Sequence, residues 1–137
     1  MTTKKSPSLK SLKAKAWKVF SEYIRKRGAD EGGTNTCITC GKLAHWKELH
    51  AGHFVGGRRN AVLFNEDLTH PQCVTCNIFL GGNYQAYTLK MLDMYGRDKV
   101  DEFLALKHKT VKLTRADFVD IIDMYRYKIR LLSTAKD

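Results

Sequence analysis

The sequence has little proline, no long apolar run and few acidic residues beside its basic ones. Two prolines and ten glycines in 137 residues exclude a collagen-like or linker-like chain. No window approaches the roughly 18 uninterrupted apolar residues of a membrane span, so we expect no membrane partner. The basic N-terminal stretch lacks the apolar segment of a secretory signal, and we therefore expect a chain that is not exported.

What is present favours one globular domain with a polyanionic partner. The apolar fraction of 43% is too high for a disordered chain, and 137 residues suffice for one modest core. Lys and Arg total 24 against 14 Asp and Glu, and residues 1–60 hold 13 of the basic side chains but only 4 of the acidic ones. This uneven positive field favours nucleic acid as the partner, although solubility alone could explain a net charge of +10.

The four cysteines fall into two pairs, Cys37-Ile-Thr-Cys40 and Cys73-Val-Thr-Cys76. In a reducing compartment this paired C-x-x-C spacing predicts a structural zinc ion held by four thiolates. Gly41 follows the first pair, where the chain must turn sharply. Two disulfides or a redox pair are the alternatives. The interval between the pairs exceeds the usual gap of about 15–20 residues, so we expect further structure between them.

Helical periodicity is clear at both ends of the chain. Residues 8–27 predict an amphipathic helix capped by Ser8 and ended by Gly28, preceded by a disordered basic tail over 1–7. Its lysines lie mostly off the apolar stripe and either contact phosphate or form a solvated face; Lys13 and Lys18 are our candidates for DNA contact. After Tyr84 the chain predicts three helices, over 84–95, over 100–107, and from a capping box at Thr114-Arg-Ala-Asp117 onward.

The central segment predicts a small zinc-pinned unit. We expect a loop over 29–36, strand character over 46–55, a turn carrying Arg58 and Arg59, and a second hairpin strand over 61–64. A helix should open at the second cysteine pair and break at Gly81-Gly82-Asn83. The predicted organisation is one domain over 8–137, comprising a basic helix (8–28), a zinc-pinned core (37–83) and a helical extension (84–137).

Three histidines and an amide lie within this unit. His50, His53 and His70 stand between the cysteine pairs, and Asn77 follows the second pair directly. A lone histidine is usually a packed or exposed ring. Here, however, a neutral imidazole, an oxygen ligand and neighbouring guanidinium groups together supply the parts for metal-assisted hydrolysis of a phosphodiester.

The combined motif resembles a known family. It runs through Cys37-x-x-Cys40, His50-Ala-Gly-His53-Phe54, Phe64-Asn-Glu-Asp-Leu-Thr-His70-Pro-Gln-Cys73-Val-Thr-Cys76-Asn77, Gly82-Asn83 and Tyr87. This string resembles the phage NinG (Rap) recombination proteins and, more broadly, HNH or His-Me finger endonucleases of the endonuclease VII type. The resemblance implies an α+β fold with a ββα-metal core pinned by the four cysteines, a basic N-terminal helix and C-terminal helices.

The resemblance also implies residue roles. His53 corresponds to the general base, and Asn77 to a ligand of a catalytic Mg²⁺ or Mn²⁺. His50 stands where relatives have an aspartate that ligates the same cation, and an imidazole there favours softer ions than Mg²⁺. Leu68 occupies the place of the middle asparagine of the HNH motif. His70 positions phosphate or braces the site in place of that asparagine.

The function implied is a metal-dependent endonuclease that cleaves branched DNA, such as Holliday junctions and D-loops, during phage recombination in the host cytoplasm. Arg58 and Arg59 would contact the DNA, and the helices from Tyr84 onward would build a homodimer, with recombination proteins as further partners. Three alternatives stay open. They are a zinc-stabilised DNA-binding adaptor without catalysis, an HNH nuclease that cuts linear duplex, and a structural zinc protein with no nucleic-acid role.

Overall fold

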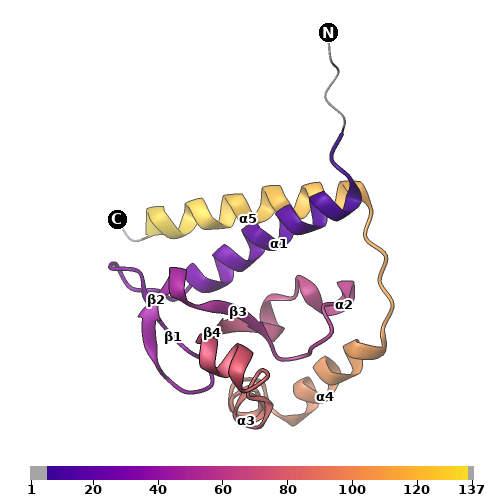
Figure 1. Cartoon of the computed structure of the whole chain (residues 1–137). Helices are drawn as coiled ribbons and strands as arrows, with labels where there is room; N and C mark the ends of the chain where they lie inside the picture. Colours follow the sequence, from indigo (N-terminus) through magenta and orange to yellow (C-terminus); the bar gives the residue numbers. More distant parts are fainter. Residues whose placement is uncertain (1–5, 136–137) are drawn as a thin grey trace.

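The structure, a computed structural model, describes residues 6–135, so most of the predicted tail over 1–7 lies outside the described residues. Helices α1 and α5 lie along one side of the molecule, the strands lie beside them, and α3 and α4 lie on the opposite side (Figure 1). No helix of the described part is long and apolar enough to cross a bilayer. The elements are α1 (Leu9–Lys26), β1 (Thr34–Thr36), β2 (Leu43–His45), β3 (His50–His53), α2 (Asn60–Leu63), β4 (Thr69–Gln72), a π-helical turn (Thr75–Phe79), α3 (Tyr84–Tyr95), α4 (Arg97–Ala105) and α5 (Arg115–Ala135).

Helix α1 follows the sequence prediction closely. The Ser8 hydroxyl accepts a hydrogen bond from the Ser11 N–H and so caps the first turn. Gly28, at a φ of +79°, lies just beyond the end, in a conformation that favours glycine. The buried stripe recurs every four residues, at Leu12, Ala16, Phe20 and Ile24. Because this stripe is buried, only the other faces of α1 can contribute side chains to a functional site.

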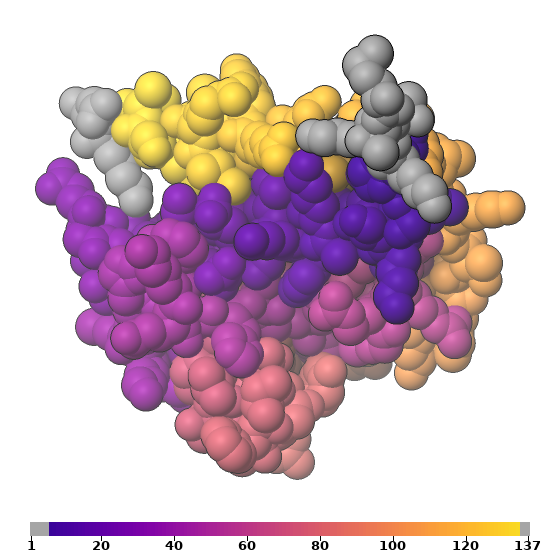
Figure 2. Space-filling model, turned by 45° about the horizontal axis from the view of Figure 1, so that its top comes forward, coloured from indigo at the N-terminus to yellow at the C-terminus, as the bar shows by residue number. Residues whose placement is uncertain are grey.

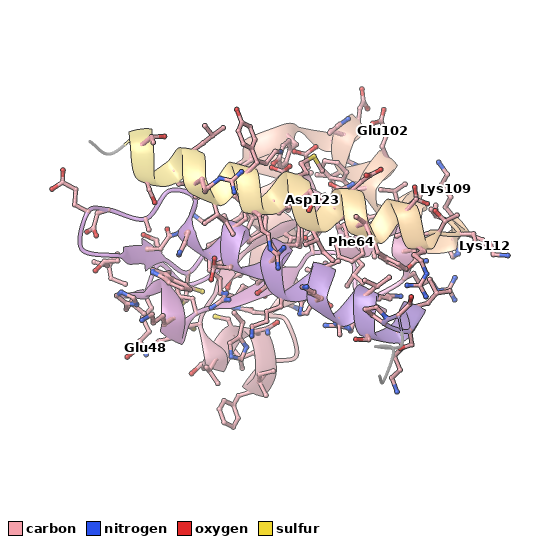
Figure 3. All side chains as sticks on the ribbon, turned by 90° about the horizontal axis from the view of Figure 1, so that it is seen from above. Glu48, Phe64, Glu102, Lys109, Lys112 and Asp123 are labelled. Atoms are coloured by element: carbon pink, nitrogen blue, oxygen red, sulfur yellow. The ribbon has the colours of Figure 1, made fainter. Side chains whose placement is uncertain are left out.

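Helix α5 packs against α1. The predicted capping box is confirmed, because the Asp117 carboxylate accepts from the Thr114 N–H and the Thr114 hydroxyl accepts from the Asp117 N–H. The buried side chains of α5 meet the α1 stripe through edge-on ring contacts, and Phe64 lies between them. Seen from above, α5 lies across α1 with Phe64 close to both (Figure 3). The buried residues contributed by α5 are Phe118, Ile122 and Tyr125.

The central strands correct the sequence analysis. The predicted second strand over 61–64 is wrong: residues 60–63 form the short helix α2, and β3 pairs instead with β4 in an antiparallel register. A run of four apolar residues fits a helix or a strand equally well, so its length could not decide. The predicted loop over 29–36 is also partly wrong, because it contains β1, which pairs with β2. Strand β3 is shorter than predicted, since residues 46–48 form a 3₁₀ turn.

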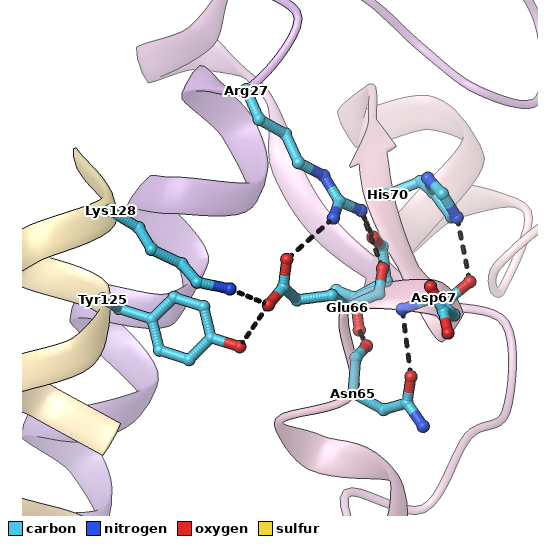
Figure 4. Close-up of polar contacts among 8 residues, drawn as sticks. Arg27, Asn65, Glu66, Asp67, His70, Tyr125 and Lys128 are labelled. Atoms are coloured by element: carbon cyan, nitrogen blue, oxygen red, sulfur yellow. Dashed lines mark hydrogen bonds and ion pairs between the residues drawn. The ribbon is translucent and has the colours of Figure 1, made fainter. Parts of the chain in front are cut away.

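The loop between β3 and β4 is held to the two long helices by one carboxylate. Glu66 accepts hydrogen bonds from the Tyr125 hydroxyl (2.9 Å) and from Lys128 Nζ (2.6 Å), both on α5 (Figure 4). Arg27, just after α1, lies 3.5 Å from the same carboxylate and donates to the Glu66 and Thr69 carbonyls. Burial opposes ionisation of Glu66, but the bonds from Lys128 and Tyr125 outweigh it and lower its pKa. The loop is therefore fixed to α1 and α5.

Gly52 of β3 has no room for a side chain. Gln72 stands two residues along the paired strand from the partner of Gly52, and its side-chain oxygen occupies the place that a Cβ of residue 52 would take. The same glutamine donates to the Gly82 carbonyl, and the Gly52 carbonyl accepts from the Tyr87 hydroxyl at 2.7 Å. Gly52 therefore locks the strand pair against α3.

We predict that Gly52→Ala destabilises the protein by about 1–3 kcal/mol, because the new methyl group displaces the buried Gln72 side chain. Chemical denaturation measures the loss. Gly32→Ala is the matched control, because its Cβ would meet Asp30 at an ordinary 3.5 Å. Equal stability of the two variants would contradict the packing argument.

Candidate functional site

The four cysteines form one cluster. The Sγ atoms of Cys37, Cys40, Cys73 and Cys76 all lie within 4.8 Å of one another. The Cys40 and Cys73 sulfurs are 3.7 Å apart, close to the edge of about 3.8 Å that follows from tetrahedral Zn–S bonds of about 2.3 Å. A set of four thiol donors at this spacing fits a zinc ion. The cluster could hold such a metal, as the paired spacing predicted.

Tight turns present these sulfurs. The Gly41 N–H donates to the Cys37 carbonyl, with Gly41 at a φ of +80°, and this closes the first turn. In the second, the Cys76 N–H points at the Cys73 sulfur and the Asn83 amide at the Cys76 sulfur, each at 3.5 Å. Donors aimed at sulfur stabilise thiolates, the form that binds metal.

We predict that Cys37→Ser abolishes metal binding at the cluster and unfolds the central unit, because the free energy of metal binding would be part of the free energy of folding. Metal analysis of the purified protein and thermal denaturation measure both effects. Val74→Ala, an exposed change in the second turn, is the control and should keep its metal. Native stability and metal content in Cys37→Ser would disprove the assignment.

His50 and Asn77 meet beside this cluster. Asn77 Nδ2 lies 3.0 Å from His50 Nδ1, so the amide donates to the ring nitrogen. Both side chains line a polar cavity of about 360 Å³. The cavity is cationic, because its wall contains three basic side chains and no carboxylate. It is lined by Trp17, Ser21, Arg25, Lys47, Leu49, His50, Ala51, Arg58 and Asn77.

His53 lies on the other face of β3. Strand side chains alternate, so His50 and His53, three residues apart, point to opposite faces. The His53 ring stacks on Trp17 of α1, with centroids 5.1 Å apart, and is absent from the described wall of the cavity. Its Nε2 lies 3.0 Å from the Leu63 carbonyl, which can only accept, so Nδ1 is the free nitrogen of the neutral ring.

Burial lowers the pKa of His53, and the nearby positive charge of Arg58 lowers it further, while the bond to the Leu63 carbonyl opposes the shift. The ring is therefore neutral at neutral pH. A neutral imidazole with one fixed N–H has the form that a general base requires. The structure thus brings His50 together with Asn77, and it places His53 one aromatic ring away from them.

The two neighbouring arginines have different positions. Arg58, at a φ of +51°, lines the cavity and lies over the Trp17 ring at 4.8 Å. Arg59 instead donates to the Lys107 carbonyl at 3.1 Å, which ties its loop to the segment after α4. Of this predicted DNA-contacting pair, Arg58 alone lies at the cavity.

The sequence analysis did not single out Trp17, Arg25 or Lys47. Trp17, Ser21 and Arg25 follow each other at intervals of four residues, so they share one face of α1. That spacing was visible in the sequence, but nothing in the sequence showed that this face meets His50.

His70 and Leu68 support the loop rather than the cavity wall. The buried ring of His70 lies with Nε2 3.0 Å from the Asp67 carbonyl, and Leu68 is fully buried in the core beneath α3 and α4. In the same loop, the Asn65 side chain accepts a hydrogen bond from the Asp67 N–H at 2.9 Å. His70 therefore contacts the loop before β4 and is not among the residues that line the cavity.

Burial, with the nearby charge of Arg27, lowers the pKa of His70 to about 4, although the Asp67 carbonyl opposes the shift. The unfolded chain, with an ordinary histidine pKa of 6.5, then binds a proton more readily than the folded one. We predict that His70 contributes its full stability above pH 6.5 and loses up to about 3 kcal/mol as the pH falls from 6.5 to 4.

Denaturation curves across this pH range test the prediction. In His70→Gln the decline in stability should become shallower, whereas His108→Gln, at an exposed position, should follow the wild-type curve. Identical slopes in all three proteins would show that His70 titrates normally.

Two of the predicted phosphate contacts lie outside the cavity. Lys18 borders a groove of about 460 Å³ between α1 and α5, together with Lys15, Arg126 and Arg130. Lys13 borders a separate hollow with Arg59 and Lys109, and Figure 3 shows Lys109 near the end of the molecule where α1 begins. Figure 2 shows α1 exposed between α5 and the central unit. Helix α1 therefore carries basic side chains on both of its flanks.

The fold and the site define a mixed α/β protein with two small antiparallel sheets and a four-cysteine cluster that can hold a metal ion such as zinc. Comparison with known proteins places it more narrowly. The chain belongs to the NinG family, because the family model described as "Bacteriophage Lambda NinG protein" matches residues 2–135.

Curated relatives agree with this assignment. The chain is 30% identical over 124 residues, 88% of its length, to "Protein ninG" of Escherichia phage lambda and to that of Salmonella phage P22, and covers 57% of each. It is 32% identical over 90 residues, 64% of its length, to "Protein ninG" of Enterobacteria phage H19B, of which it covers 41%. The chain thus spans little more than half the length of the phage lambda and P22 proteins. No solved structure matches it.

Proposed function

We propose that the protein is a metal-dependent endonuclease that cleaves branched DNA in phage recombination, through a ββα-metal site of the HNH type. The observation that carries the proposal is the meeting of His50 and Asn77 at the wall of a cationic cavity. The order of elements also supports the proposal, because the antiparallel pair of β3 and β4 is followed directly by the π-helical turn that contains Cys76. The motif resemblance supplies branched DNA as the substrate class.

In this proposal His50 and Asn77 hold the catalytic cation. A rotation of about 180° about the terminal χ angle of Asn77 would turn its amide oxygen toward the cation. His50 would offer Nδ1, the ring nitrogen that accepts a hydrogen bond from the Asn77 amide in this structure. A bound Mg²⁺ or Mn²⁺ would polarise the scissile phosphate and stabilise the leaving oxygen. Because imidazole is a softer ligand than carboxylate, we expect Mn²⁺ to support more activity than Mg²⁺.

His53 is the proposed general base. Its Nε2 proton is fixed by the Leu63 carbonyl, so Nδ1 can take a proton from the attacking water. Since Trp17 stands between this ring and the cavity, the proposal requires the indole to rotate when DNA enters. Arg58 would move with it, because its guanidinium lies over the same indole.

The charge distribution supports a nucleic-acid substrate. Arg25, Lys47 and Arg58 surround the cavity with donors for phosphate oxygens. The groove between α1 and α5 adds four basic side chains against one carboxylate, that of Glu22, which pairs with Lys26. DNA backbone could thus be held on both flanks of α1.

The homodimer, the recombination-protein partners and the host cytoplasm remain predictions.

A DNA-binding adaptor without catalysis is the second candidate. Two observations favour it: Leu68 is buried where the motif has its asparagine, and His53 faces α1 rather than the cavity. The two candidates share every feature of DNA binding and differ only in whether the phosphodiester is cut.

Cleavage of a synthetic four-way junction with Mn²⁺ or Mg²⁺ separates them. We predict that Asn77→Ala lowers the cleavage rate by about 100-fold or more and that His53→Ala lowers it by about 10²–10⁴-fold, with junction binding retained in both. His108→Ala is the control at an exposed position. A wild-type protein that binds junctions but never cuts them would establish the adaptor instead, and faster cutting of linear duplex would favour a duplex nuclease.

A further inference from the structure

The residues directly after Asn77 form an exposed apolar tip. Ile78, Phe79 and Leu80 have exposed fractions of 58%, 78% and 56%. Exposing three consecutive apolar side chains, one of them a phenylalanine, to solvent is unfavourable in free energy. Such a cluster indicates a binding surface. The tip lies beside the proposed cation ligand, which connects it to the cavity.

The tip is held rigidly by the cysteine cluster. The Leu80 N–H donates to the Thr75 carbonyl at 2.8 Å, and the Gly82 N–H donates to the Cys76 carbonyl at 2.9 Å. Gln72, fully buried, donates to the Gly82 carbonyl at 2.9 Å. Hydrogen bonds to the backbone therefore hold the turn that carries the tip, in which all three apolar side chains are exposed.

Tyr84 connects the tip to the loop that carries Arg58. Its ring lies so close to Gly82 that a Cβ there would meet ring atoms at 2.9 Å, and a Cβ added at Gly56 would meet its hydroxyl at the same distance. The tyrosine is 44% exposed. No acidic residue occurs between Asp67 and Asp93. Tyr84 thus lies beside both the tip and the Arg58 loop, and neither residues 68–92 nor the described lining of the cavity include a carboxylate.

We propose that Phe79 and Tyr84, with Ile78 and Leu80, form a platform that stacks on bases exposed at a DNA branch point. An intact duplex hides the faces of its bases, whereas a junction or displacement loop exposes them. Aromatic side chains stack on bases regardless of sequence, and apolar side chains insert at unstacked steps. The inference rests on the proposed function and deepens it, because it gives a physical reason for a preference for branched DNA.

Charge favours DNA over a second copy of this chain as the occupant. The platform adjoins the basic wall formed by Arg25, Lys47 and Arg58, and each chain carries a net charge of +10. Two copies that met through this surface would bring like charges together, whereas a polyanion with exposed bases matches both the charge and the apolar tip.

Phe79→Ala tests the platform, because removing an exposed side chain leaves the core intact. Binding is measured without added Mg²⁺ or Mn²⁺, by fluorescence anisotropy on a four-way junction and on a linear duplex of the same sequence. We expect junction affinity to fall about tenfold, duplex affinity to stay unchanged, and the salt dependence of binding to keep its slope, because stacking involves no phosphate contact. Leu89→Ala, 65% exposed on α3, is the matched control and should bind like wild type.

Other results would overturn the proposal. An unchanged junction affinity, an equal loss on duplex, or a change in the salt slope would each exclude base stacking by Phe79. Loss of self-association in Phe79→Ala during sedimentation, with junction binding unaffected, would assign the surface to a second copy. The test does not depend on catalysis. If the wild-type protein cuts junctions but Phe79→Ala binds them normally, the platform is refuted and the proposed nuclease activity stands. If the wild-type protein never cuts but Phe79→Ala selectively loses junction binding, the platform is supported and the nuclease activity is refuted.

Discussion

The four-thiol cluster is the constraint on which the central unit depends. It joins two turns that are separated by more than 30 residues, and the strand pairs next to these turns span only three and four residues. Pairs this short are marginally stable by themselves. Because the cluster fixes Cys76, it also fixes Asn77 and the exposed tip that follows. A bound zinc ion would therefore stabilise the fold and position the site through the same contacts.

The long helices could be predicted because their signals are local. Ser8, Gly28 and the Thr114–Asp117 box mark ends, and the apolar stripes mark buried faces. The strands could not be predicted well, since β4 reads Thr-His-Pro-Gln and is buried although it is almost wholly polar. Its stability comes from tertiary partners, such as the hydrogen bonds of Gln72 to Thr39 and Gly82. No local pattern contains that information.

The candidate site was predictable to a similar degree. The motif selected His50 and Asn77, which meet, and the four cysteines, which cluster. It could not distinguish Arg58 from Arg59, because the two have the same side chain and charge, although Arg58 lies over Trp17 and Arg59 bonds to the Lys107 carbonyl. Nor could it find the α1 face of Trp17 and Arg25, since the contact between α1 and β3 joins segments some 30 residues apart. A sequence motif does not contain the spatial arrangement of segments that lie far apart in the chain.

The register of one short strand decides which face of β3 each histidine occupies. Ala51 packs on α1 with Phe20 and Ile24, and Gly52 receives Gln72, so the two middle residues lock the strand and its ends carry His50 and His53. A slip of one residue would exchange the faces of the two rings. The locked register keeps the ring that meets Asn77 on the cavity side and the neutral ring against Trp17. The two rings therefore have different surroundings, since His53 is desolvated against an indole while His50 lines the polar cavity.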